Sequence, residues 1–366
     1  MTLRIAMVGA CPFPVPQGSQ AHLADTARAV KDLGHAVTLV VYGYGLGADP
    51  PDLAITRAWS RSRRGRTRAG PSFWKPVHDL ALTATLRSLR DIDLIHAHNY
   101  EGLMCALTSR RRPIVYQAHN AMADELPHYF GGAGWARRAG AWLDRALPRR
   151  ADAVIAPHSR LRDHLIACGC DADKVFVIPP ALDATQFEMA VHSAEMPPVL
   201  YTGNLDAYQN LPLLHDAMTR VRYEEPKARL LFATADIDAI EGAEVVPVHD
   251  FGGLRQVLAH EAVVACPRVS WSGYPIKLLN AMAAGQALVA CEGAAPGLTD
   301  GEDALLVPDD DAEAFAAALL RLLRDAGLRR RLGAAARARV EGQHAPAVIG
   351  EAIGRVYGAL TRTDTD

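Results

Sequence analysis

Residues 3–41 read LRIAMVGACPFPVPQGSQAHLADTARAVKDLGHAVTLVV, and this stretch decides the fold. An apolar run over 3–9 is followed by a loop rich in proline and glycine. Apolar residues then recur at helical spacing over about 21–33, Gly34 ends the helix, and 36–41 form a second apolar run. A strand, a helix and a strand in this order predict a right-handed βαβ unit and a parallel sheet.

The same alternation continues along the chain, so the predicted fold class is α/β. Further strands are predicted over 94–97, 114–118, 153–156 and 175–178, then over 199–203, 229–233, 244–248, 262–266 and 287–291. Two doubly wound, Rossmann-like domains over residues 1–180 and 181–345 follow from this pattern. A last helix over about 346–362 is expected to pack back on the first domain.

Composition is that of an ordinary globular protein, with 49% hydrophobic and 22% charged residues. No apolar run has the roughly 18 residues of a membrane helix, and the N-terminus resembles a buried strand rather than a signal peptide. We therefore expect a cytoplasmic protein with reduced thiols. The six cysteines form no Cys-x-x-Cys pair, which predicts no zinc site.

The two halves of the chain differ in charge. Residues 1–180 hold 23 Lys and Arg against 15 Asp and Glu, whereas residues 181–366 hold 16 against 26. Six arginines concentrate the positive charge: Arg57, Arg61, Arg63, Arg64, Arg66 and Arg68. The segment is either a solvated loop or a contact with an anionic membrane surface or phosphate-bearing acceptor. A nucleic-acid partner is not expected, because no recognition motif or aromatic platform accompanies the arginines.

Candidate ligand-binding residues of the first domain follow the predicted strands, because open α/β sheets bind ligands beyond the carboxyl ends of their strands. Gly18 and Ser19 precede the first helix, where backbone N–H groups suit a phosphate or a sugar hydroxyl. His119 follows the strand at 114–118 and is the candidate for hydrogen bonding to a sugar hydroxyl or a phosphate oxygen in the cleft, with a purely structural role as the alternative. His22 and His98 are candidates for the rim of the acceptor site.

The segment 267–280, PRVSWSGYPIKLLN, is the richest candidate site in the second half. A proline before the predicted helix suits its start, and a helix N-terminus favours anions. Arg268 and Lys277 would add the cationic donors that a diphosphate requires. The alternative for Lys277 is a solvent-facing helix residue.

These motifs together resemble one family, the retaining glycosyltransferases of the GT-B fold in family 4, related to glycogen synthase. The resemblance covers nearly the whole chain. Its motifs are residues 18–22 with 33–37, residues 201–210, residues 272–285 and residues 301–308.

The resemblance implies transfer of a sugar from a nucleotide-sugar donor, a UDP- or GDP-sugar, to an acceptor hydroxyl with retention of configuration. It implies no cofactor and no metal, a nucleotide in the second domain and an acceptor, a glycan or a lipid-linked precursor, in the first. His119 matches the cleft histidine near the donor sugar. The donor-site residues implied are Gly18, Ser19, Gly203, Asn204, Gln209, Arg268, Ser272, Gly273, Tyr274, Pro275, Ile276, Lys277 and Asn280.

The chain departs from the family pattern at four ionisable positions. Asn204 and Gln209 stand where the family has an arginine and a lysine, and Ser272 and Asn280 replace two glutamates. The hypothesis we favour is that Arg268 and Lys277 supply the missing positive charge. The alternatives are a sugar-nucleotide-binding pseudoenzyme and a GT-B sugar-nucleotide epimerase.

Overall fold

The structure is a computed structural model that describes residues 2–15, 17–60, 74–191, 196–235 and 240–361. The chain divides into two compact units. The first unit holds residues 1–181 and 346–366, and the second unit holds residues 182–345.

The first unit is built on a parallel sheet in the order β3-β2-β1-β4-β5-β6-β7. Its strands are β1 (Arg4–Gly9), β2 (Ala36–Val41), β3 (Ala54–Arg57), β4 (Leu94–His98), β5 (Ile114–Gln117), β6 (Ala153–Ala156) and β7 (Val175–Val177). The central strands are buried on both faces, as expected of a parallel sheet covered by helices. The strand order reverses between β1 and β4, which is where doubly wound folds bind ligands.

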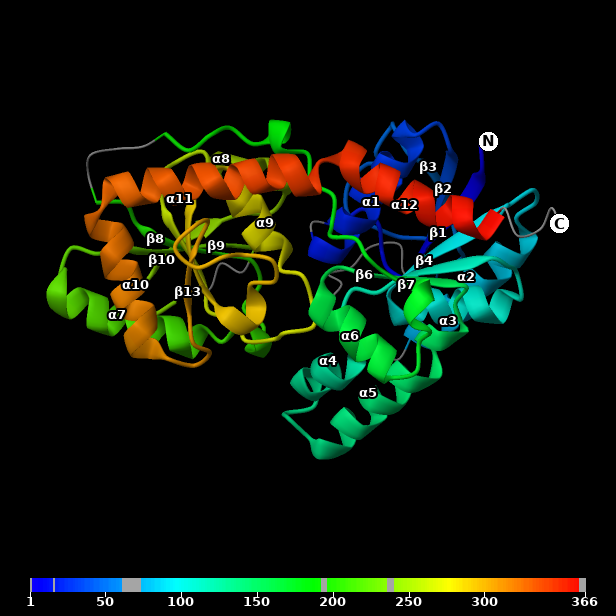
Figure 1. Cartoon of the computed structure of the whole chain (residues 1–366), viewed down its shortest axis with the longest axis horizontal. Coiled ribbons are helices and arrows are strands. Elements are labelled where there is room, and N and C mark those ends of the chain that lie inside the picture. The colour runs from blue at the N-terminus through cyan, green and yellow to red at the C-terminus, as the bar shows by residue number, and fades with distance from the viewer. Residues whose placement is uncertain (1, 16, 61–73, 192–195, 236–239, 362–366) are drawn as a thin grey trace. The chain divides into compact units, whose positions relative to one another are not determined.

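Helices cover both faces of this sheet (Figure 1). They are α1 (Gly18–Asp32), α2 (Lys75–Ser88), α3 (Asn99–Ser109), α4 (Met122–Tyr129), α5 (Gly134–Ala146), α6 (Ser159–Ala167) and the final helix α12 (Pro346–Thr361). In Figure 1, α12, in red, runs beside α1, in blue. The two helices pack closely at Gly350, where a Cβ atom would lie 2.5 Å from the carbonyl oxygen of Ala29.

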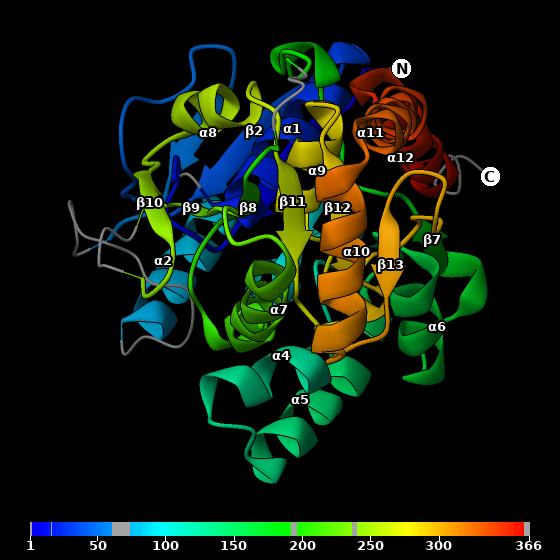
Figure 2. The same ribbon diagram turned by 90° about the vertical axis from the view of Figure 1, so that its left-hand side faces the viewer.

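The second unit repeats the architecture with a parallel sheet in the order β10-β9-β8-β11-β12-β13. Its strands are β8 (Val199–Thr202), β9 (Leu230–Thr234), β10 (Glu244–Pro247), β11 (Val263–Cys266), β12 (Ala287–Cys291) and β13 (Leu305–Val307). Its helices are α7 (Leu211–Glu224), α8 (Phe251–Leu258), α9 (Ile276–Ala283), α10 (Ala312–Arg324) and α11 (Ala326–Arg339). Helices α7 and α10 pack against each other on one face of the sheet (Figure 2). Here the strand order reverses between β8 and β11.

The predicted elements are present, with small shifts at their ends. Helix α1 begins at Gly18, three residues before the predicted start, because the glycine and serine of the loop already adopt the first helical turn. Two short strands, β3 and β13, were not predicted. Among the described residues, no helix combines the length and the apolarity needed to cross a bilayer.

Candidate functional site: two clusters at the sheet switch points

Four histidines gather at the carboxyl ends of the central strands of the first unit. His96 and His98 lie on β4, His119 follows β5, and His22 lies on α1. Nδ1 of His98 is 3.0 Å from Nε2 of His119, and the ring centroids of His22 and His119 are 4.9 Å apart. The structure therefore brings together the predicted residues His22, His98 and His119 beside the β1/β4 switch point.

Burial keeps these imidazoles neutral. Loss of hydration lowers the pKa of His22 to about 4 and that of His96 to about 3. It also lowers the pKa of His98 and of His119 well below the usual value, and the neighbouring histidines add to the effect. Neutral imidazoles at pH 7 can donate or accept hydrogen bonds but supply no positive charge.

Three of the histidines also lie close enough to be considered as a metal site. One ring nitrogen each of His22, His98 and His119 lies within 4.8 Å of the others. Neutral imidazole is a common ligand for zinc and related metals. A metal site formed by these three histidines was not predicted, because the residues are far apart along the chain.

The loop that carries His119 is held by a buried carboxylate. Asp144 on α5 accepts hydrogen bonds from the backbone N–H groups of Met122 at 2.8 Å and of Ala123 at 3.1 Å. It also accepts one from the hydroxyl of Tyr100 at 2.5 Å. Asp144 thus binds the N-terminal turn of α4 and fixes the position of the preceding loop.

A second cluster lies at the β8/β11 switch point of the second unit. The ammonium of Lys277, in the first turn of α9, donates to the side-chain oxygen of Gln209. The amide of Gln209 donates in turn to the side-chain oxygen of Asn204 at 2.8 Å. Gly203 has a φ of +120° that favours glycine, and its missing side chain leaves space beside the Lys277 stem.

Two cations meet in this cluster. The Lys277 ammonium lies 4.3 Å from the ring centroid of Tyr201, and the Arg268 guanidinium lies 5.3 Å from that of Tyr208. Burial, together with the neighbouring Arg268 charge, lowers the pKa of Lys277 to about 8. Arg268 donates to Ser270 at 3.0 Å, while its buried Nε has no partner within the described residues. The second unit therefore holds two cationic side chains just after β11 and at the start of α9, and the Nε–H group of one of them, Arg268, has no hydrogen-bond partner among the described residues.

Most of the other predicted donor-site residues lie in α9 or in the turn that leads to it. Ser272 and Asn280 are buried, and Gly273 and Pro275 lie in the turn that leads to Ile276. The Tyr274 hydroxyl pairs with Nε2 of His344 at 3.2 Å, so its side chain packs inside the second unit. Gly18 and Ser19 lie in the first unit, where Ser19 donates to the side chain of Gln20 at 2.7 Å.

The arginine-rich segment is described only at its start. Arg57 lies at the end of β3, pairs with Asp49 and donates to the carbonyl oxygens of Phe13 and Tyr42. This arginine is therefore engaged within the first unit. Arg61, Arg63, Arg64, Arg66 and Arg68 lie outside the described residues.

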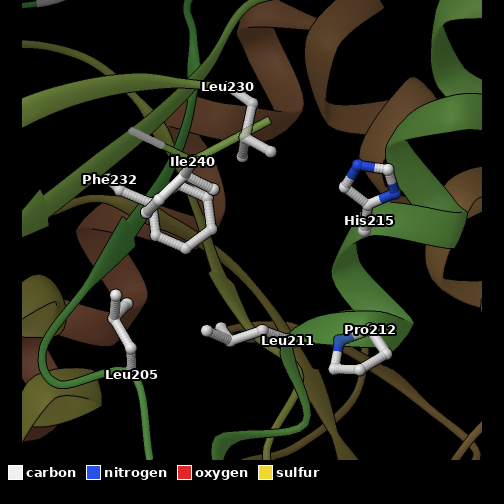
Figure 3. Close-up of a pocket in the computed structure, with 7 residues that line it drawn as sticks. All are labelled: Leu205, Leu211, Pro212, His215, Leu230, Phe232 and Ile240. Carbon is white, nitrogen blue, oxygen red and sulfur yellow. The ribbon is translucent and has the colours of Figure 1, made fainter. Parts of the chain in front are cut away.

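An open cavity of about 420 Å³ lies elsewhere in the second unit. Figure 3 shows its lining, which is apolar except for His215 and comes from Leu205, Leu211, Pro212, His215, Leu230, Phe232 and Ile240. It contains none of the predicted donor-site residues. With no lysine or arginine in its lining, this cavity does not suit a diphosphate.

Two residues that contact the histidine cluster were not predicted from the sequence. Gln117 ends β5 between the histidines, and Tyr357 reaches them from α12. Polar residues in buried strands are the one signal that could have pointed to Gln117.

Two family profiles match the chain. The profile described as Glycosyltransferase Family 4 matches residues 16–186, and that described as Glycosyl transferases group 1 matches residues 197–325. Together the two matches cover most of both units. The chain belongs to glycosyltransferase family 4.

A curated relative agrees with this assignment, and solved structures agree with the fold. The chain is 28% identical to a phosphatidyl-myo-inositol mannosyltransferase from Mycolicibacterium smegmatis, over 98% of this chain and 94% of the relative. A sucrose-phosphate synthase from Thermosynechococcus elongatus superposes with a TM-score of 0.81 at 20% identity, over 99% of this chain and 100% of that chain. Anabaena HepE, solved with UDP-glucose, superposes with a TM-score of 0.73 at 16% identity, over 98% and 100%.

The predicted family and the predicted fold are thereby confirmed. This family 4 member is a glycosyltransferase with two Rossmann-like parallel-sheet units of the GT-B fold.

Proposed function

We propose that this glycosyltransferase transfers a sugar from a UDP- or GDP-sugar with retention of configuration and without a metal or other cofactor. The second unit binds the nucleotide, and the first unit binds the acceptor. One observation carries the proposal: the Lys277 ammonium contacts Gln209, the residue that stands where the family has a lysine. A cation from α9 thus replaces the charge that the family pattern supplies from the loop after β8.

The positive charge of this cluster suits the proposed reaction. Cleavage of the bond to the sugar leaves negative charge on the nucleotide diphosphate. Lys277, Arg268 and the N-terminal N–H groups of α9 are preorganised donors for that charge. No protein nucleophile is assigned. His119, neutral and half-buried, is the proposed hydrogen-bond partner of the donor sugar.

The acceptor that the observations favour is a lipid or a lipid-linked glycan at an anionic membrane surface. The relative named above acts, by its name, on phosphatidyl-myo-inositol. In this chain, Trp135 and Trp142 on α5 are 58% and 65% exposed and seven residues apart, so they share one helical face. Arg138 and Arg145 follow them at helical spacing. Aromatic and basic residues on one face suit a membrane interface better than the Arg57–Arg68 segment alone.

Turnover in EDTA tests the proposal. The protein is incubated with UDP-glucose or GDP-mannose, with and without vesicles that contain phosphatidylinositol, and the products are followed by NMR. We expect slow donor hydrolysis without vesicles, transfer with vesicles, and an α-anomeric product from an α-configured donor. The variant Trp135→Ala/Trp142→Ala should lose the stimulation by vesicles and keep the hydrolysis.

Two outcomes would contradict the proposal. Activity that EDTA abolishes and Mg²⁺ restores would overturn the metal-independent mechanism. Nucleotide binding with no release of sugar from any donor would favour a pseudoenzyme, for which the replacement of the two glutamates by Ser272 and Asn280 already provides a rationale.

A further inference from the structure

A buried chain of hydrogen bonds connects the last helix to the histidine cluster. The Tyr357 hydroxyl on α12 is 2.6 Å from Nδ1 of His96. Nε2 of His96 is 3.1 Å from the side-chain oxygen of Gln117, and the Gln117 amide nitrogen is 3.3 Å from Nε2 of His22. All four side chains are at most 6% exposed, and the chain joins residues 261 positions apart.

The phenol of Tyr357 sets the direction of donation along this hydrogen-bond chain. Within the described residues, the Tyr357 hydroxyl has one hydrogen-bond partner, Nδ1 of His96. Its single hydrogen must be donated there, because a buried hydroxyl without an acceptor is unfavourable. His96 is then protonated on Nε2 and donates to the oxygen of Gln117, whose amide nitrogen donates to His22.

His22, the last residue of the hydrogen-bond chain, is left with its proton on a defined nitrogen. Because Nε2 of His22 accepts from Gln117, the neutral imidazole carries its hydrogen on Nδ1. This Nδ1 is buried and has no partner in the described part of the chain. Turning the Gln117 amide over would reverse every bond and leave the Tyr357 hydrogen without an acceptor.

We propose that Tyr357 is a positioning residue that, through His96 and Gln117, fixes the proton of His22 on Nδ1 and presents this N–H group to an oxygen atom of the bound substrate. The ligand oxygen belongs to a phosphate or a hydroxyl group. The effect on turnover rests on the proposed function, whereas the proton position in the free protein does not.

The inference also bears on the two uses of the cluster. A metal ion requires the lone pair of a His22 ring nitrogen, but in the proposed state Nδ1 is protonated and Nε2 accepts a hydrogen bond from Gln117. Metal binding would have to break this hydrogen-bond chain, so the proposal favours substrate contact over metal binding at His22, His98 and His119.

NMR of ¹⁵N-histidine-labelled protein tests the proposal without substrate. In the wild type, the His22 proton should reside on Nδ1. In Tyr357→Phe, which keeps the ring and removes the hydroxyl, His22 should become a mixture of both neutral tautomers. Gln117→Leu, which removes the amide from the middle of the chain, should give the same mixture and serves as the second variant if Tyr357→Phe does not fold.

Kinetics give the second readout. Loss of one neutral hydrogen bond predicts that Tyr357→Phe lowers kcat for donor hydrolysis about three- to tenfold, with KM changed less than about twofold. Ile353→Val, a packing change on the same face of α12, is the matched control and should alter neither the tautomer nor kcat.

A wild-type His22 protonated on Nε2 would overturn the proposal, as would an unchanged tautomer in both variants. Co²⁺ binding with visible absorption that is lost in His22→Ala would overturn it in favour of a metal site. Absence of turnover in the wild type with the expected tautomer would refute the proposed function and leave the hydrogen-bond chain intact.

Discussion

Lys277→Ala should weaken the binding of UDP or GDP about 10- to 150-fold, because a hydrogen bond to a charged group contributes about 1.5–3 kcal/mol. The ammonium lies beside Gln209 and Tyr201 at the switch point of the second unit. Removing it leaves Arg268 as the neighbouring cation. Isothermal titration of the nucleotide into wild type and variant measures the difference. Lys227→Ala, an exposed lysine in the same unit, is the control for the change in net charge.

The same experiment has a pH dependence with a definite sign. Burial lowers the pKa of Lys277 to about 8, so the free protein loses this charge as the pH rises above 8. A diphosphate binds the protonated form better, and its affinity should therefore fall between about pH 8 and 9.5 in the wild type. The affinity of Lys277→Ala should stay flat over this interval. Equal affinities for wild type and variant at pH 7 would contradict the idea of relocated charge.

His119→Ala should lower kcat by about 100-fold or more, a loss typical of removing one preorganised hydrogen-bonding group from a reacting centre. The affinity for free UDP or GDP should change less than about twofold, since Lys277 and Arg268 are proposed to hold the diphosphate. His119→Gln, which keeps a donor and an acceptor, should recover part of the activity. Steady-state kinetics and nucleotide titration together give the two numbers.

A structural role for His119 would produce a different result. Its ring contacts His98 at 3.0 Å, so its loss could disturb the cluster rather than the chemistry. Equal losses in turnover and in nucleotide affinity, with a lower melting temperature, would contradict the proposed contact with the donor sugar. His128→Ala, on α4 outside the cluster, is the control for replacing a histidine in this unit.

The sheets could be predicted from the sequence, because buried parallel strands are nearly continuous apolar runs. Strands such as β1 and β12 therefore stand out. β3 and β13 did not, since both strands are short and lie at sheet edges, and β3 also carries only exposed or partly buried residues. The start of α1 was misplaced because glycine and serine are typical of turns as well as of first helical turns.

The residues at the strand ends of the two clusters could also be predicted, because sheet topology alone places them at the carboxyl edge of each sheet. His119 follows β5 and Arg268 follows β11. The contact of Lys277 with Gln209 joins residues 68 positions apart, and no local pattern encodes it. The same holds for Asp144, whose role depends on packing α5 against α4.

Binding of nucleotides in EDTA tests the central claim, a metal-independent nucleotide-sugar site, most directly. The melting temperature of the purified protein is measured with UDP, GDP, dTDP and ADP, each with and without EDTA. A ligand that binds the native state raises this temperature. The account predicts a rise with UDP or GDP that EDTA leaves unchanged and that Lys277→Ala largely removes. No rise with any nucleotide, or a rise that EDTA abolishes, would contradict it.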